Sequence, residues 1–160
     1  RADPNGSIGE DHDPETHLIP LVIKGLLEEN GFINIYGDDY PTKDGTCIRD
    51  YIHVMDLADA HIAALDFLNK NPPQIVSFNI GTGKGTSVLE IIKKFIDVNL
   101  VSLPYKYESR REGDSAWVVA DNKFALERLD WWPKRSLEDM CADSFRWSKY
   151  ALKFHKLENY

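Results

Sequence analysis

Apolar side chains recur at helical spacing in several stretches of the chain, and shorter apolar runs lie between these stretches. Positions i, i+3, i+4 and i+7 share one face of a helix, whereas every second position shares one face of a strand. The pattern predicts an α/β fold of short strands that alternate with helices. The predicted helices span residues 16–28 or begin near residues 56, 87, 121 and 137, and the predicted strands span residues 33–36, 48–54, 75–80 and 105–107.

Capping residues mark the start of two predicted helices. Asp56 suits the N-cap of the second helix, and an S-x-x-E capping box begins the third helix at Ser87. Alternation along the strand predicted over residues 48–54 would place Arg49 and Tyr51 on one polar face. A cation and an aromatic ring would then point to the same side of a sheet.

The composition limits the size and class of the protein. The chain has 160 residues, of which 42% are hydrophobic, so one compact domain is expected. A net charge of −7 and a pI of about 5.2 argue against nucleic acid or an anionic membrane as a partner. Cys47 and Cys141 are predicted to be free thiols, and this indicates a cytoplasmic location. The polar start at Arg1, without a methionine, indicates a fragment.

Two patterns come close to chemical motifs without matching them. Glycines at positions 81, 83 and 85 give G-x-G-x-G, which fits neither the dinucleotide-binding template nor the Walker template, so a tight strand-to-helix turn is predicted there. The acidic cluster at residues 10–13, with the nearby His17, has the spacing of no closed zinc or calcium site. A solvated loop without a metal ion is predicted for it.

Arginines in two separate segments suggest a site for an anionic ligand. Arg110 and Arg111 stand close to Asp114 in a charged loop, and Arg49 adds a second basic point. The planar guanidinium group suits phosphate oxygens, and a carboxylate can accept hydrogen bonds from ribose hydroxyls. On spacing alone, an exposed loop of salt bridges is the alternative. A diphosphate is well suited to two arginines that come from separate elements.

Residues 40–61, YPTKDGTCIRDYIHVMDLADAH, resemble the UDP-galactose 4-epimerase family of extended short-chain dehydrogenase/reductases. The core R-D-Y-I-H-V is shared widely among extended nucleotide-sugar enzymes, whereas the turn YPTKDGT resembles the 4-epimerases in particular. The resemblance extends over most of the chain. Further matches are IGED at residues 8–11, FNIGTG at residues 78–83, SVL at residues 87–89 and RREGD at residues 110–114.

The resemblance implies that residues 1–160 are a single C-terminal, substrate-binding region of an extended Rossmann-type reductase. Such a region is incomplete without an N-terminal domain that binds most of the cofactor NAD. We therefore expect the chain to expose apolar surfaces that pack against that domain in relatives. The whole protein is expected to be a homodimer, as relatives commonly are.

The resemblance also implies the ligand, UDP-glucose or UDP-galactose, and the residues that bind it. His17 stands where relatives usually carry an asparagine beside the substrate, and Val118 stands where relatives limit the size of the C2 substituent of the sugar. A side chain of modest size at Val118 leaves N-acetylated sugars open. The remaining implied residues are Leu18, Asn34 and Tyr36 for the uracil, Arg49 and Arg111 for the diphosphate, Tyr51 for the same pocket and Asp114 for the ribose.

The chemistry of the family needs residues that this sequence does not contain. NAD takes a hydride from C4 of the hexose and returns it to the opposite face, with a Tyr-x-x-x-Lys pair and a glycine-rich cofactor loop. No tyrosine in this sequence has a lysine four positions later. The nearest approach is Tyr150, which precedes Lys153 by three positions. We therefore predict no catalytic residue in this chain. A related dehydratase or uronic-acid 4-epimerase, and a non-enzymatic UDP-sugar-binding fragment, are the alternatives.

Overall fold

The computed structural model describes residues 2–157 and has the predicted α/β architecture. Within these residues, five helices lie between short strands that form two small sheets. None of the described helices has the length and hydrophobicity of a membrane span. The elements are α1 (Leu18–Leu27), β1 (Ile33–Tyr36), β2 (Ile48–Arg49), α2 (Val54–Lys70), β3 (Thr86–Ser87), α3 (Val88–Asn99), β4 (Tyr105–Glu108), β5 (Trp117–Val118), α4 (Lys123–Leu129) and α5 (Leu137–Leu157).

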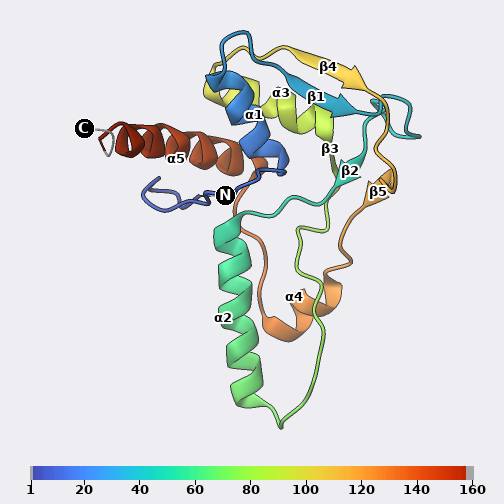
Figure 1. Ribbon diagram of the computed structural model, residues 1–160. Coiled ribbons are helices and arrows are strands. Elements are labelled where there is room, and N and C mark those ends of the chain that lie inside the picture. Colours follow the sequence, from blue (N-terminus) through green and yellow to red (C-terminus); the bar gives the residue numbers. More distant parts are fainter. Residues whose placement is uncertain (1, 158–160) are drawn as a thin grey trace.

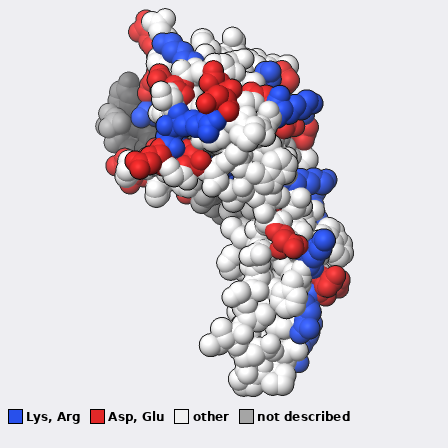
Figure 2. Space-filling view, turned by 90° about the vertical axis from the view of Figure 1, so that its right-hand side faces the viewer, with Lys and Arg blue, Asp and Glu red and all other residues white. Residues whose placement is uncertain are grey.

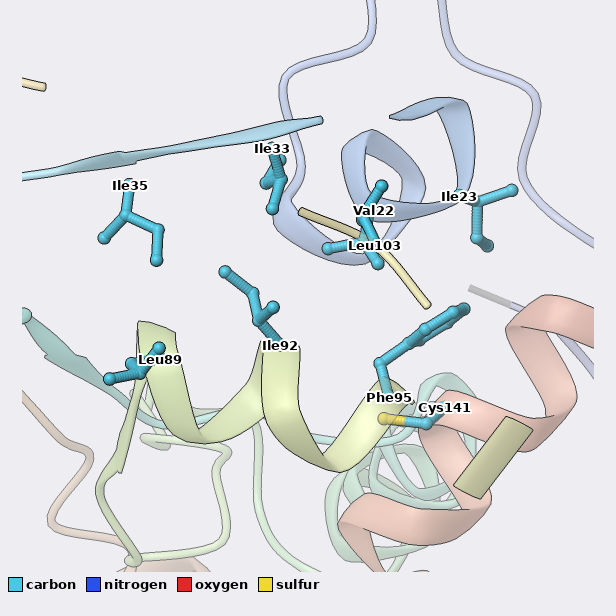
Figure 3. Packing of buried hydrophobic residues seen from close by; sticks show 9 residues of the cluster. All are labelled: Val22, Ile23, Ile33, Ile35, Leu89, Ile92, Phe95, Leu103 and Cys141. Atoms are coloured by element: carbon cyan, nitrogen blue, oxygen red, sulfur yellow. The ribbon is translucent and has the colours of Figure 1, made fainter. Parts of the chain in front are cut away.

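The main core lies between the sheet β1–β4 and helices α1, α3 and α5 (Figure 1). Strands β1 and β4 pair in parallel, with Tyr36 opposite Glu108. Side chains of β1 and α3, among them Ile35 and Ile92, point toward one another across this core (Figure 3). Cys141 of α5 is fully buried there as a free thiol, as predicted, and burial raises the pKa of its thiol to about 12.

A second, smaller sheet joins three distant segments in the order β3-β2-β5. Strand β2 pairs antiparallel with β3 and in parallel with β5. In this register Arg49 of β2 lies opposite Thr86 on one side and Val118 on the other. The sheet therefore places Arg49, predicted to bind the diphosphate, next to Val118, predicted to limit the C2 substituent of the sugar.

Helices α2 and α4 form an arm that extends away from the main core (Figure 1). They pack on one another through a separate hydrophobic cluster that contains Phe67, Leu129 and Trp131. Figure 2 shows a large uncharged surface on the lower part of the molecule. Large apolar residues of α2 and its surroundings are exposed, which is the kind of surface that the resemblance led us to expect: Ile62, Leu65, Leu68, Ile75 and Trp132.

The start of α2 differs from the prediction. The strand predicted over residues 48–54 ends at Arg49, and the helix begins at Val54 with His53 as its N-cap. The ring Nδ1 of His53 accepts a hydrogen bond from the backbone N–H of Met55 at 3.1 Å. Asp56 was the predicted N-cap, but its carboxylate bonds instead to residues far along the chain and is buried in the first turn. Strand β2 ends at Arg49 because its pairing with β3 and with β5 ends there.

The strand predicted over residues 75–80 is also absent. This segment is extended, but no strand within residues 2–157 pairs with it, and Ile75 is fully exposed. An apolar run becomes a strand only when a neighbouring strand satisfies its backbone groups. The prediction of a helix from Thr16 was two residues early, since α1 begins at Leu18.

The predicted capping box of α3 is confirmed. The hydroxyl of Ser87 accepts a hydrogen bond from the backbone N–H of Glu90 at 3.0 Å, and the Glu90 carboxylate accepts one from the Ser87 N–H at 3.5 Å. The same hydroxyl donates to the carboxylate of Asp44. Burial opposes the ionisation of Asp44, but hydrogen bonds from Ser87 and Thr46 outweigh it and lower the pKa.

Replacing Ser87 with alanine is expected to lower the free energy of unfolding by about 1–2 kcal/mol, because the helix loses its N-cap and Asp44 loses a donor. Urea denaturation would measure the change. Ser102→Ala, at an exposed loop position, is the matched control. Equal unfolding midpoints for the two variants would contradict a stabilising role for the cap.

Candidate functional site

Arg49 is held rigidly at the end of β2. Its Nη1 donates hydrogen bonds to the carbonyl oxygens of Ile48 and Ser115, both at 2.8 Å. Its Nη2 lies 3.4 Å from an Asp114 carboxylate oxygen, and the side chain is about one-quarter exposed. Two bonds to backbone carbonyls fix the plane of the guanidinium group. A positive charge is therefore fixed in place and still reachable from solvent.

Arg111 meets the same carboxylate from the charged loop. Its Nε donates to the other oxygen of Asp114 at 2.9 Å, and its guanidinium carbon lies 5.0 Å from the centre of the Tyr36 ring. The side chain is 59% exposed, and its Nη groups make no hydrogen bond to any residue in the described part of the chain. Arg49, Asp114, Arg111 and Tyr36 thus form one connected group, called here the arginine cluster.

Arg110 lies beside Arg111 in sequence but serves a different contact. Its Nε donates to the carboxylate of Asp39 at 2.6 Å, and its guanidinium carbon lies 4.1 Å from the centre of the Tyr40 ring. Arg110 therefore fastens the charged loop to the turn at residues 37–46. Of the two arginines in the RREGD motif, Arg110 attaches the loop to the turn and Arg111 belongs to the arginine cluster.

Val118 lies next to the arginine cluster. It pairs with Arg49 across the β2–β5 ladder, and half of its side chain is exposed. Both residues line a hollow of about 490 Å³ together with Asp50 and Asn79. A ligand bound to Arg49 can therefore reach Val118 directly.

His17, Leu18 and Tyr51 lie together elsewhere. They line a cavity of about 150 Å³ between the start of α1 and the segment that precedes α2, and Met140 of α5 also lines it. Burial raises the pKa of Tyr51 to about 12, so its phenol stays protonated near neutral pH and can donate a hydrogen bond. The prediction that Tyr51 shares one strand face with Arg49 fails, because β2 ends at Arg49.

Asn34 of β1 carries a buried polar atom without a partner. Its side-chain oxygen makes no hydrogen bond within the described residues. Asn34 lines a hollow of about 230 Å³ with Leu21 of α1 and with Tyr36, which follows it on the same face of the strand. The predicted uracil residues Asn34 and Tyr36 therefore share one hollow, while Leu18 lies in a different cavity.

Asp50 is a site residue that the sequence did not reveal. Its carboxylate accepts hydrogen bonds from the N–H groups of Thr82 and Gly83, both at 2.9 Å, and from that of Ala120 at 3.3 Å. These bonds tie the glycine-rich turn and the segment after β5 to the end of β2. The N–H groups of Thr82 and Gly83 thus bond to Asp50 within the protein, in agreement with the prediction of a tight strand-to-helix turn at residues 81–85.

The histidines of the cluster at residues 10–13 and 17 contact one another and the nearby Glu15. The ring Nδ1 of His17 lies 2.9 Å from the Glu15 carboxylate, and the rings of His12 and His17 meet edge to face. Among the side chains that the structure describes, residues 2–152, no three from His, Cys, Asp or Glu lie close enough to hold a metal ion together.

The comparisons with known proteins show which enzymes the chain resembles. Residues 5–81 match the NAD dependent epimerase/dehydratase family. The chain is 48% identical to the UDP-glucose 4-epimerase of Halalkalibacterium halodurans over 99% of its own length and 47% of that protein. It is 44% identical to the UDP-glucose 4-epimerase of Bacillus subtilis, of which it covers 46%. The chain is thus similar to UDP-glucose 4-epimerases over most of its own length, and it spans just under half the length of the curated relatives it matches.

Solved structures of UDP-glucose 4-epimerases are also similar to this chain. UDP-glucose 4-epimerase from Stenotrophomonas maltophila, with bound NAD and formylated UDP-arabinopyranose, is 41% identical with a TM-score of 0.86 over 94% of this chain and 45% of that one. The enzyme from Bifidobacterium longum, in complex with NAD+ and UDP, is 39% identical with a TM-score of 0.86 over 93% of this chain and 44% of that one. The fold described above is therefore the fold of one part of such enzymes.

Proposed function

We propose that this chain is the UDP-hexose-binding part of an NAD-dependent UDP-glucose 4-epimerase, which interconverts UDP-galactose and UDP-glucose through a transient 4-keto sugar. The arginine cluster carries the proposal. Arg49 and Arg111 come from separate elements, 62 positions apart in the sequence, yet both contact the carboxylate of Asp114. Two guanidinium groups at one accessible point suit a diphosphate, as the relatives' UDP ligands also suggest.

The other residues of the cluster fit the remaining parts of such a ligand. The ring of Tyr36 is exposed and offers a flat apolar face for a uracil base. Asp114 has a carboxylate within reach of ribose hydroxyls once a phosphate engages the arginines. Val118, opposite Arg49 in the small sheet, would face the hexose, and its modest size leaves space for a C2 substituent.

The proposed function assigns cofactor binding to residues outside this chain. NAD would supply the hydride acceptor, but the glycine-rich turn at residues 81–85 is poorly suited to its pyrophosphate, because Asp50 accepts hydrogen bonds from the N–H groups of Thr82 and Gly83. The sequence also lacks a Tyr-x-x-x-Lys pair. The role proposed for residues 1–160 is to bind and orient the nucleotide sugar. The homodimer and the cytoplasmic location stay predictions.

Calorimetric titration of the chain with UDP tests the proposal, with ADP as the control nucleotide. We expect UDP to bind and ADP to bind more weakly, because the uracil residues distinguish the bases. An assay with UDP-galactose and NAD should yield no UDP-glucose. Equal affinity for the two nucleotides, or no binding of UDP, would overturn the binding role, and measurable turnover would refute the assignment of the chemistry to other residues.

A further inference from the structure

The two oxygens of Asp114 make unequal contacts with the two arginines. The distance to Nε of Arg111 is 2.9 Å, whereas the distance to Nη2 of Arg49 is 3.4 Å. Arg49 is already fixed by its bonds to the carbonyl oxygens of Ile48 and Ser115. Arg111 has no such backbone bonds, so Asp114 is its principal polar anchor within the described residues.

Asp114 contacts Arg111 at Nε, and this choice of atom determines which N–H groups of the guanidinium group can reach a ligand. Nε lies on one edge of the planar guanidinium group, and the two Nη groups form the opposite end. The Tyr36 ring lies 5.0 Å from the guanidinium carbon and limits its movement. A contact at Nε therefore orients the group and leaves its Nη donors available to a ligand.

We propose that Asp114 is a positioning residue for Arg111, which it holds in the orientation that binds the diphosphate, in addition to any contact with the ribose. This inference rests on the proposed function. A long arginine side chain on an exposed loop loses much rotamer freedom when it binds a ligand. An anchor present before binding removes part of that cost.

A double-mutant cycle separates this role from a direct ribose contact. UDP affinity is measured by calorimetry for the wild type, Asp114→Ala, Arg111→Ala and the double variant. We expect Asp114→Ala to weaken UDP binding about 10-fold in the wild-type background and only about 2- to 3-fold in the Arg111→Ala background, where the ribose contact alone is left to lose. Equal losses in the two backgrounds would show that Asp114 acts on the ribose alone and would overturn the proposal.

Asp114→Asn keeps an oxygen that can accept the Nε–H bond but removes the negative charge. The proposal expects its affinity to be higher than that of Asp114→Ala. A role limited to charge predicts that both variants bind UDP equally well, and tighter than the wild type, because a like charge near the diphosphate has gone.

A measurement without ligand distinguishes failure of this inference from failure of the proposed function. The NMR signal of the Arg111 Nε–H should be protected from solvent exchange in the wild type and in Asp114→Asn, and lost in Asp114→Ala. Equal exchange in the wild type and Asp114→Ala would overturn the positioning role, whether or not UDP binds. Absence of UDP binding with a protected Nε–H would instead refute the proposed function alone.

Discussion

Replacing Arg111 with alanine is expected to weaken the binding of UDP by about 10- to 100-fold, whereas Arg110→Ala leaves it within about 2-fold. The two residues are neighbours in sequence and have the same charge. Arg111 keeps its Nη groups free beside Tyr36, while Arg110 is engaged with Asp39 and lies over the Tyr40 ring. A charge-assisted hydrogen bond contributes about 1.5–3 kcal/mol, which gives the expected range.

Calorimetric titration of both variants with UDP measures this difference, and the pair controls for net charge because each variant loses one positive charge from the same loop. Thermal denaturation of each variant would show whether the loop still folds. The assignment is wrong if Arg110→Ala loses as much affinity as Arg111→Ala. That result would mean that the ligand responds to the overall charge of the loop and not to the geometry of the arginine cluster.

Replacing Asp56 with alanine is expected to lower the free energy of unfolding by about 3 kcal/mol. The carboxylate is only 1% exposed and accepts hydrogen bonds from the backbone N–H groups of Lys134 and Arg135, at 3.1 and 2.9 Å. Nη1 of Arg135 donates to it at 2.5 Å. Its loss leaves two backbone N–H groups without this acceptor and leaves Arg135 only the longer contact with Asp59, at the junction between the arm and the main core.

Asp59→Ala is the matched control for Asp56→Ala. Asp59 lies on the same helix and contacts the same Nη1 of Arg135, but at 3.5 Å and with 39% of its side chain exposed. Exposed ion pairs of this kind contribute about 0–1 kcal/mol. Urea denaturation followed by circular dichroism would measure both variants, and similar losses of stability would argue that burial does not set the contribution of Asp56.

The hydrophobic pattern was sufficient for the helices and for the strands of the main core. It identified α3 and its capping box because these depend on residues close together in the sequence. It failed at residues 75–80, because an apolar run does not show whether a neighbouring strand exists. It failed at Asp56 because the partners of this carboxylate lie 78 and 79 positions further along the chain.

The candidate site was predictable to a similar degree. Residue chemistry suggested that Arg49 and the charged loop share a site for an anion, with an exposed loop of salt bridges as the alternative, and the structure brings Arg49 into contact with Asp114 of that loop. Spacing alone could not show which of the adjacent residues Arg110 and Arg111 binds the ligand, because only the folded loop shows that Arg111 lies beside Tyr36. The resemblance to the 4-epimerases pointed to Arg111. Asp50 went unnoticed because its role depends on backbone N–H groups, which every residue carries and which only folding brings within reach.

The parallel pairing of β1 with β4 has a consequence for how such a site can vary. Tyr36 stands opposite Glu108, and Arg111 follows three positions after that pair, which is the distance that brings its guanidinium group to the Tyr36 ring. Shortening this connection by one residue would present Glu112 to the ring, and lengthening it by one would present Arg110. Under the proposed function, the length of the loop after β4 therefore affects ligand binding together with the identity of its arginines.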